Sequence, residues 1–79
     1  MKPNSPHIGH EIERCLHNQG RTVAWLAKQM NLSRPNVYRI FQRPTIDTGM
    51  LQQISYILHF NFFDLYTNQH LLEEPSDEL

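Results

Sequence analysis

Five basic side chains occur between residues 20 and 43, a stretch that contains no acidic residue. They are Arg21, Lys28, Arg34, Arg39 and Arg43. Guanidinium and ammonium groups bind phosphate oxygens, and such a local excess of positive charge is typical of a surface that meets nucleic acid. A solvated protein face can have the same composition, so the charge alone leaves both interpretations open.

The charges are divided unequally along the chain. Residues 1–46 contain all seven basic residues and two acidic ones, which gives a charge of +5. Residues 47–79 contain six acidic residues and no Lys or Arg, which gives −6. The net charge of −1 therefore conceals a strong polarity, and the first half is the one we expect to face a polyanion.

Catalysis has little support in the sequence. The chain has 79 residues, about half the usual length of one domain, so we expect a single small core. It contains no nucleophile with a nearby base, no paired carboxylates on one helix face and no glycine-rich phosphate loop. We predict that the protein is not an enzyme and uses neither a cofactor nor a small-molecule substrate.

A metal site is also not predicted. Of the five histidines, His10 and His17 lie on one face of the first expected helix, but neither a second close pair nor a CxxC motif accompanies them. The single cysteine, Cys15, falls on the apolar stripe of that helix. We expect a buried, unreactive thiol there, and a redox sensor is the alternative.

The cellular location follows from the same residues. A lone cysteine cannot form an internal disulfide, whereas small secreted domains usually need several. The first seven residues are polar and contain two prolines, and no apolar run approaches about 18 residues. We therefore expect a cytoplasmic protein that makes no membrane contact.

Apolar spacing and capping residues predict an all-α fold. The periodicity predicts helices over residues 8–18, from Thr22 to Asn31, and roughly 34–42, with Thr22 as the N-cap of the second helix and Ser33 as the N-cap of the third. Asp47 is expected to cap a fourth helix. Asn61 with Asp64 is expected to open a short fifth helix that includes Phe62, Phe63, Leu65 and Tyr66. We place one domain at residues 8–68, between a flexible N-terminus at 1–7 and an acidic, disordered tail at 69–79.

The second and third expected helices are joined by a sharp corner. Ala27 is small enough for the two helices to approach, Asn31 tolerates the left-handed conformation, and apolar residues fill the wedge between them. The stretch from Ile8 to Tyr66 resembles the Xre class of helix-turn-helix domains, the class of the Cro and lambda repressor proteins. The matching residues are Ile8, Gly9, Ile12, Gly20, Thr22, Leu26, Ala27, Leu32, Ser33, Arg34, Val37, Arg39, Ile40, Ile54, Leu58 and Leu65.

This resemblance implies a compact five-helix, lambda repressor-like domain whose second motif helix, residues 33–42, lies in the DNA major groove. The residues that it implies as base contacts are Arg34, Pro35, Asn36, Tyr38 and Arg39. Those that it implies as contacts to the DNA backbone are Arg21, Thr22, Lys28, Ser33, Gln42 and Arg43. Val23 replaces a glutamine that many members place on a phosphate, and Asn31 replaces the turn glycine.

The expected function is sequence-specific binding of double-stranded DNA by a transcriptional regulator, a repressor of prokaryotic or phage type. A possible homodimer would form through the fourth and fifth helices, where we expect most of the aromatic group Phe60, Phe62, Phe63 and Tyr66 to be core. The alternative is a helix-turn-helix module specialised for protein–protein interaction, which would use these aromatic residues and Trp25. Partial packing of Trp25 against the first helix is the preferred interpretation.

Overall fold

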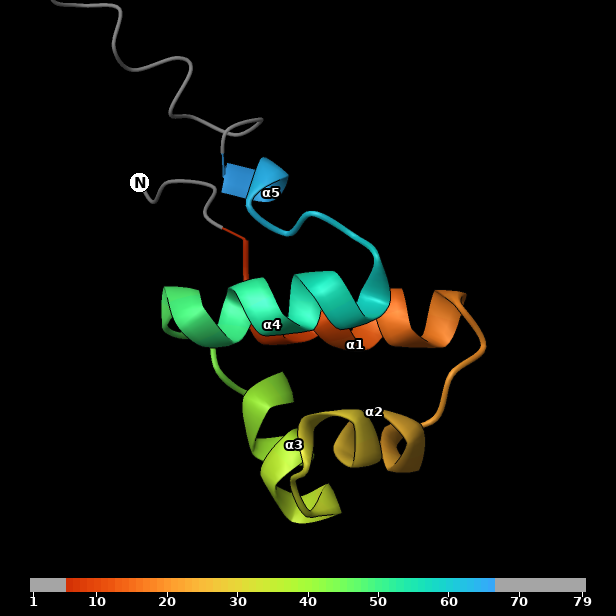
Figure 1. Ribbon diagram of the computed structural model, residues 1–79. Coiled ribbons are helices and arrows are strands. Elements are labelled where there is room, and N and C mark those ends of the chain that lie inside the picture. The colour runs from red at the N-terminus through yellow and green to blue at the C-terminus, as the bar shows by residue number, and fades with distance from the viewer. Residues whose placement is uncertain (1–5, 67–79) are drawn as a thin grey trace, which may run out of the picture.

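The computed structural model describes residues 6–66, and over this range the fold is all-α with no strand (Figure 1). Its five helices are α1 (Ile8–Asn18), α2 (Val23–Met30), α3 (Arg34–Phe41), α4 (Thr48–Leu58) and α5 (Asp64–Tyr66). The predicted all-α, five-helix fold is thus confirmed. The predictions for the acidic tail and for residues 1–5 of the N-terminal segment concern residues outside the described range.

Side-chain caps define where the helices begin. The side-chain oxygens of Thr22, Ser33 and Asp47 accept hydrogen bonds from the backbone N–H three residues ahead, at 3.0, 3.3 and 2.7 Å. Each of these contacts satisfies a donor that has no partner inside its helix. The three predicted caps are confirmed, and α3 ends one residue earlier than expected because Gln42 is its C-cap.

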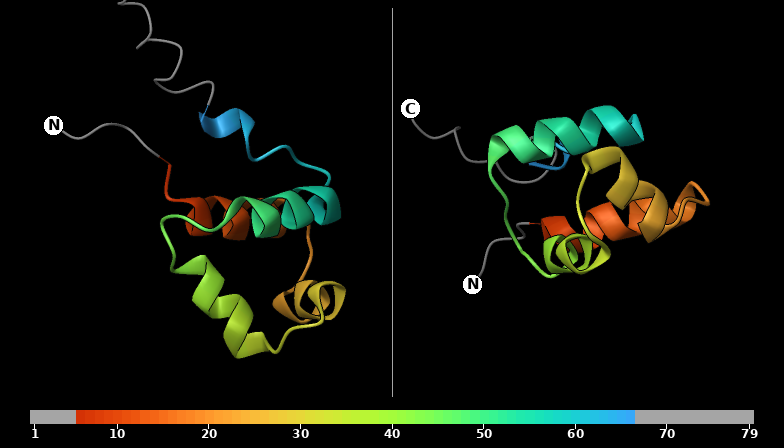
Figure 2. Two further views of the ribbon diagram at one scale, coloured as in Figure 1. Left: turned by 60° about the vertical axis from the view of Figure 1, so that its left-hand side comes forward. Right: turned by 60° about the horizontal axis from the view of Figure 1, so that its bottom comes forward.

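The core lies where the four longer helices meet. It is formed by Ile8, Ile12, Leu16, Leu26, Ala27, Met30, Val37, Ile40, Phe41, Leu51, Ile54, Leu58 and Phe62. Helix α1 packs against α3 and α4, and α2 packs against α3. Figures 1 and 2 show α2 and α3 on one side of the α1 and α4 pair and α5 on the other side.

The fifth helix begins later than the sequence predicted. Within the described residues it covers Asp64–Tyr66, so the expectation that Phe62 and Phe63 belong to it is wrong. Asn61 uses its Oδ1 to accept from the Phe63 N–H at 3.1 Å, which closes a local turn before α5 begins. The Nδ2 of Asn61 also donates to Oδ1 of Asp64 at 3.2 Å.

Candidate nucleic-acid interface

The corner between α2 and α3 consists of Asn31, Leu32 and Ser33. Asn31 adopts the left-handed conformation, with φ of 59° and ψ of 43°. This allows the Leu32 N–H to turn back and donate to the Ala27 carbonyl at 2.9 Å. Ser33 then caps α3. The corner therefore fixes the direction in which α3 leaves α2, as the residue types predicted.

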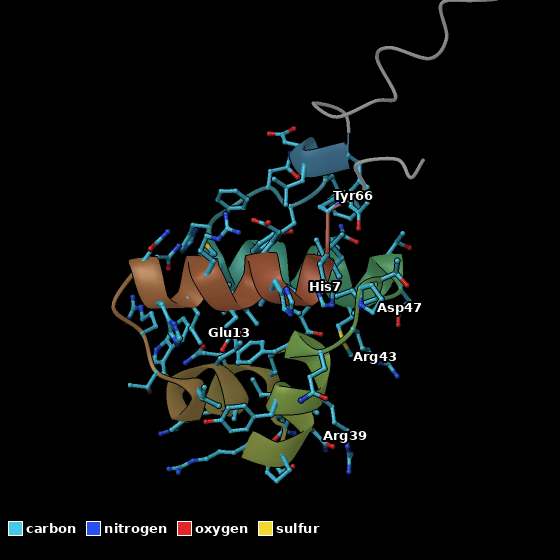
Figure 3. The ribbon with its side chains drawn as sticks, turned by 180° about the vertical axis from the view of Figure 1, so that it is seen from behind. His7, Glu13, Arg39, Arg43, Asp47 and Tyr66 are labelled. Atoms are coloured by element: carbon cyan, nitrogen blue, oxygen red, sulfur yellow. The ribbon has the colours of Figure 1, made fainter. Side chains whose placement is uncertain are left out.

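Helix α3 is buried on one side and polar on the other. Val37, Ile40 and Phe41 enter the core, whereas the outer side carries Arg34, Pro35, Tyr38 and Arg39. Gln42 and Arg43 follow directly after the helix, and all six residues are exposed. Figure 3 shows Arg39 and Arg43 along the same side of this helix. The outer side contains no acidic residue to neutralise its arginines.

Tyr38 stands on this outer side but is held in place. Its ring is half exposed, at 51%, and meets Phe41 edge-on with the ring centroids 6.0 Å apart. Such an edge-to-face contact is a favourable aromatic geometry. Because Phe41 is itself buried, the Tyr38 ring presents a fixed apolar surface beside the arginines of α3.

A hollow of about 350 Å³ lies on one flank of α3. It is lined by Thr22, Val23, Ala24, Arg34 and Tyr38, and so brings the start of α2 next to two side chains of α3. Neither helix has an acidic residue in its first turn, which leaves the positive ends of both helix dipoles uncompensated. The Thr22 oxygen accepts from Trp25, and its hydroxyl proton remains available to a phosphate.

A second hollow, of about 230 Å³, lies on the other flank. Its apolar floor comes from Leu32, Ile40 and Met50, and its polar rim from Asn36, Arg39 and Arg43. Asn36 is half-buried, and its Oδ1 accepts a hydrogen bond from Nη1 of Arg39 at 2.7 Å. The sequence placed both residues among the base contacts but gave no sign that they bond to each other.

The remaining candidate contacts are more dispersed. The Arg21 guanidinium lies over the Trp25 ring, 4.3 Å from its centroid. Trp25 is half-buried against the core, so the expected partial packing is present. Lys28 is exposed in the last turn of α2, and neither hollow includes it. Ser33 is exposed at the N-cap of α3, and Gln42 is exposed at its C-cap.

Cys15 is less buried than the sequence predicted. It is half-buried at the edge of the apolar stripe of α1, whose centre is formed by the fully buried residues Ile8, Ile12 and Leu16. Burial raises the pKa of the Cys15 thiol, and a hydrogen bond from the Gln19 side chain partly opposes the rise. A raised pKa keeps the thiol protonated near neutral pH and lowers its reactivity.

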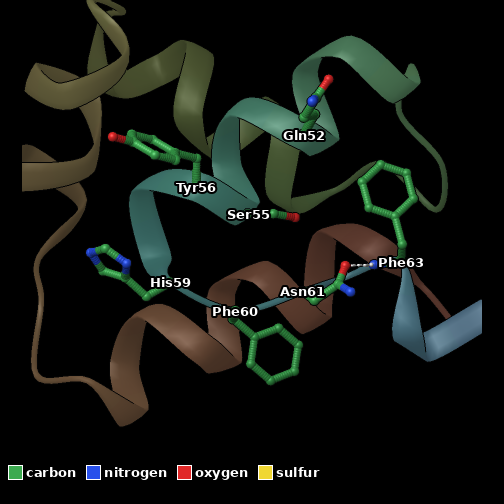
Figure 4. A pocket seen from close by; sticks show the side chains of 7 residues that line it. All are labelled: Gln52, Ser55, Tyr56, His59, Phe60, Asn61 and Phe63. Atoms are coloured by element: carbon green, nitrogen blue, oxygen red, sulfur yellow. Dashed lines mark hydrogen bonds between the residues drawn. The ribbon is translucent and has the colours of Figure 1, made fainter.

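An aromatic hollow of about 620 Å³ lies outside the α2 and α3 surface. It is lined by Gln52, Ser55, Tyr56, His59, Phe60, Asn61 and Phe63 (Figure 4). Tyr56 is 80% exposed, and Phe60 and Phe63 are exposed as well. Only Phe62 is fully buried, so the expectation that most of this group is core is wrong. In the non-helical linker between α4 and α5, Phe62 enters the core while Phe60 and Phe63 on either side of it stay at the surface.

The sequence analysis did not identify Tyr56 as an exposed aromatic residue. It lies two positions after Ile54 and two before Leu58, which places it opposite the buried stripe of α4. The helical period would have identified it.

Within residues 6–66, no three His, Cys, Asp or Glu side chains gather closely enough to hold a metal ion. In the same range no helix has both the length and the apolar character required to span a membrane.

Comparison of the chain with models of protein families, with curated proteins and with solved structures found no match.

Proposed function

We propose that this protein is a helix-turn-helix domain of the Xre class that binds double-stranded DNA sequence-specifically and regulates transcription, as a repressor of prokaryotic or phage type. One observation carries the proposal: the outer side of α3 is exposed, cationic and free of acidic residues, while its inner side anchors it in the core. An α-helix with its side chains is about 10–12 Å wide, which fits a B-DNA major groove about 12 Å wide.

In this proposal the residues of α3 divide into two groups. Arg39 and Arg34 donate paired hydrogen bonds to guanine O6 and N7, while Tyr38 and Pro35 contact thymine methyl groups. Tyr38 suits this role because the edge-on contact with Phe41 holds its ring. Asn36 lies beside Arg39 at the edge of the same surface.

The phosphate contacts surround this surface. The start of α2 supplies Thr22 with its free hydroxyl proton, and Arg34 lines the same hollow. The other proposed contacts to the DNA backbone are Arg21, Lys28, Ser33, Gln42 and Arg43. A phosphate near the starts of α2 and α3 also gains from the helix dipoles. Such a regulator would work in the cytoplasm.

Selection of bound sequences from a pool of random duplexes tests the proposal. We expect the full chain to enrich one motif, and Arg39→Ala to weaken binding to it by about 1–3 kcal/mol and to relax the preference at one base pair. Arg14→Ala is the matched control, because Arg14 is an exposed arginine on α1 that pairs with Glu11. The proposal fails if no motif is enriched or if both variants lose affinity equally.

A second candidate function, protein–protein interaction, is favoured by the aromatic hollow. The rings of Tyr56, Phe60 and Phe63 are exposed around it, and exposed aromatic clusters are typical of interaction surfaces. The homodimer expected for a DNA-binding chain would use the same hollow and would bind two half-sites, so the selected motif would be palindromic. Sedimentation of the wild type and of Tyr56→Ala would detect such a dimer and its loss.

A further inference from the structure

We propose that Asn36 is a positioning residue for Arg39, so that the two side chains together read one guanine in the major groove. This inference rests on the proposed DNA-binding function. It departs from the sequence prediction, in which Asn36 contacts a base by itself. The carrying observation is the 2.7 Å hydrogen bond from Nη1 of Arg39 to Oδ1 of Asn36, one helical turn earlier on α3.

The donors of Arg39 are sufficient for both contacts. A guanidinium has five N–H groups in a fixed planar fork and no acceptor. The bond to Asn36 uses one N–H on Nη1, which leaves the edge formed by Nε and Nη2 intact. That edge presents two parallel N–H groups, the arrangement that guanine O6 and N7 require. Asn36 therefore orients the guanidinium without occupying the edge that reads the base.

Positioning matters because Arg39 is exposed. A free arginine side chain has many rotamers, and fixing it at an interface opposes binding. Asn36 is half-buried at the rim of the hollow that Arg39 and Arg43 also line, so its own side chain is more restricted than that of Arg39. The bond thus restricts Arg39 before DNA arrives, which lowers the entropic cost of the base contact.

The neutral amide also preserves the charge of Arg39. An aspartate would accept the same hydrogen bond but would add a negative charge next to the phosphates. Replacing the Asn36 side chain leaves the helix cap in place, because the Ser33 oxygen accepts from the backbone N–H of Asn36. Substitutions at this position therefore separate positioning from folding.

The test measures binding of wild type, Asn36→Ala, Arg39→Ala and the double variant to the selected duplex and to duplexes with each base pair replaced. We expect Arg39→Ala to lose about 5- to 160-fold of preference at one base pair. Asn36→Ala should lose about 2- to 13-fold at that same base pair. The double variant should discriminate no less than Arg39→Ala alone, because Asn36 acts only through Arg39.

Asn36→Asp provides the rescue variant. It keeps the acceptor, so we expect the preference at that base pair to stay within about twofold of wild type, whereas affinity for every duplex falls through charge repulsion. Thermal unfolding of each variant provides the measure of folding.

Three results would overturn this inference but not the proposed function. Asn36→Ala could lose preference at a second base pair, or it could lose affinity equally for all duplexes. The double variant could also discriminate less than Arg39→Ala alone. If Arg39→Ala alters the preference at no base pair, the proposed function itself fails.

Discussion

The backbone of Gly9 in α1 lies directly against the carbonyl oxygen of Phe41 at the end of α3. A Cβ atom on Gly9 would overlap this oxygen and that of Ile40. The contact is reinforced by hydrogen bonds from the N–H groups of Ile8 and Gly9 to the carbonyl oxygens of Pro44 and Arg43, at 3.0 and 2.9 Å. The first turn of α1 thus anchors the end of the proposed recognition helix.

Gly9→Ala should destabilise the fold strongly. The added methyl meets backbone atoms, which cannot move aside by changing rotamer, so we expect a loss of about 3 kcal/mol or more in the free energy of unfolding. Gly49→Ala is the matched control, because a Cβ there meets only the Asp47 side chain at an ordinary 3.4 Å. Circular dichroism during heating measures both variants, and equal melting temperatures would contradict the close approach of α1 and α3.

Ala27→Leu should also destabilise the domain. Ala27 is 5% exposed on α2, which packs against α3, and overpacking a core position costs about 1–3 kcal/mol. Ala24→Leu changes the same helix at an exposed position and should leave the stability within about 0.5 kcal/mol of wild type. Chemical denaturation compares the two, and an unchanged midpoint for Ala27→Leu would mean that the corner is packed differently.

Gln19 connects the ends of two helices that are far apart in sequence. Its Nε2 donates to the Leu58 carbonyl at the end of α4, at 2.6 Å. Gln19→Ala should lower stability by about 1 kcal/mol, or the melting temperature by about 4–8 °C. Gln53→Ala, at an exposed position of α4, is the control. If both variants have the same melting temperature, the hydrogen bond of Gln19 contributes nothing to stability.

Cys15 should make stability depend on pH in the alkaline range. Burial raises its pKa in the folded state, so the unfolded chain loses the thiol proton first as the pH rises. Stability from this group is complete below the unfolded pKa and declines as the pH rises through the folded one. Denaturant titrations between pH 7 and pH 10 should show a steeper decline in wild type than in Cys15→Ala. Parallel curves would contradict the burial of the thiol.

The helices and their caps were predictable because their signals are local. Thr22, Ser33 and Asp47 each bond within three residues, and Asn31 carries its left-handed preference in its own side chain. Gly9 is among the residues that resemble the Xre pattern, but the sequence did not reveal why a glycine is needed there.

The features that the sequence missed depend on tertiary packing. Gln19 and Leu58 are 39 residues apart, and nothing in their neighbourhoods predicts that they meet. The half-burial of Cys15 and the exposure of Phe60, which line one hollow between α1 and the segment after α4, likewise depend on how distant parts of the chain pack. The bond between Asn36 and Arg39 lies within one turn of α3, but helical spacing alone does not distinguish it from two separate contacts.

The salt dependence of binding to a random duplex tests most directly whether the cationic side of α3 meets DNA. Neutralising phosphates releases counterions, so log K should fall linearly with log salt, at about −0.9 per phosphate contacted. For about four to six contacts we predict a slope near −4 or −5. Arg43→Ala should reduce its magnitude by about 0.9, and Arg14→Ala should leave it unchanged. A slope near zero, or equal changes in both variants, would contradict the account.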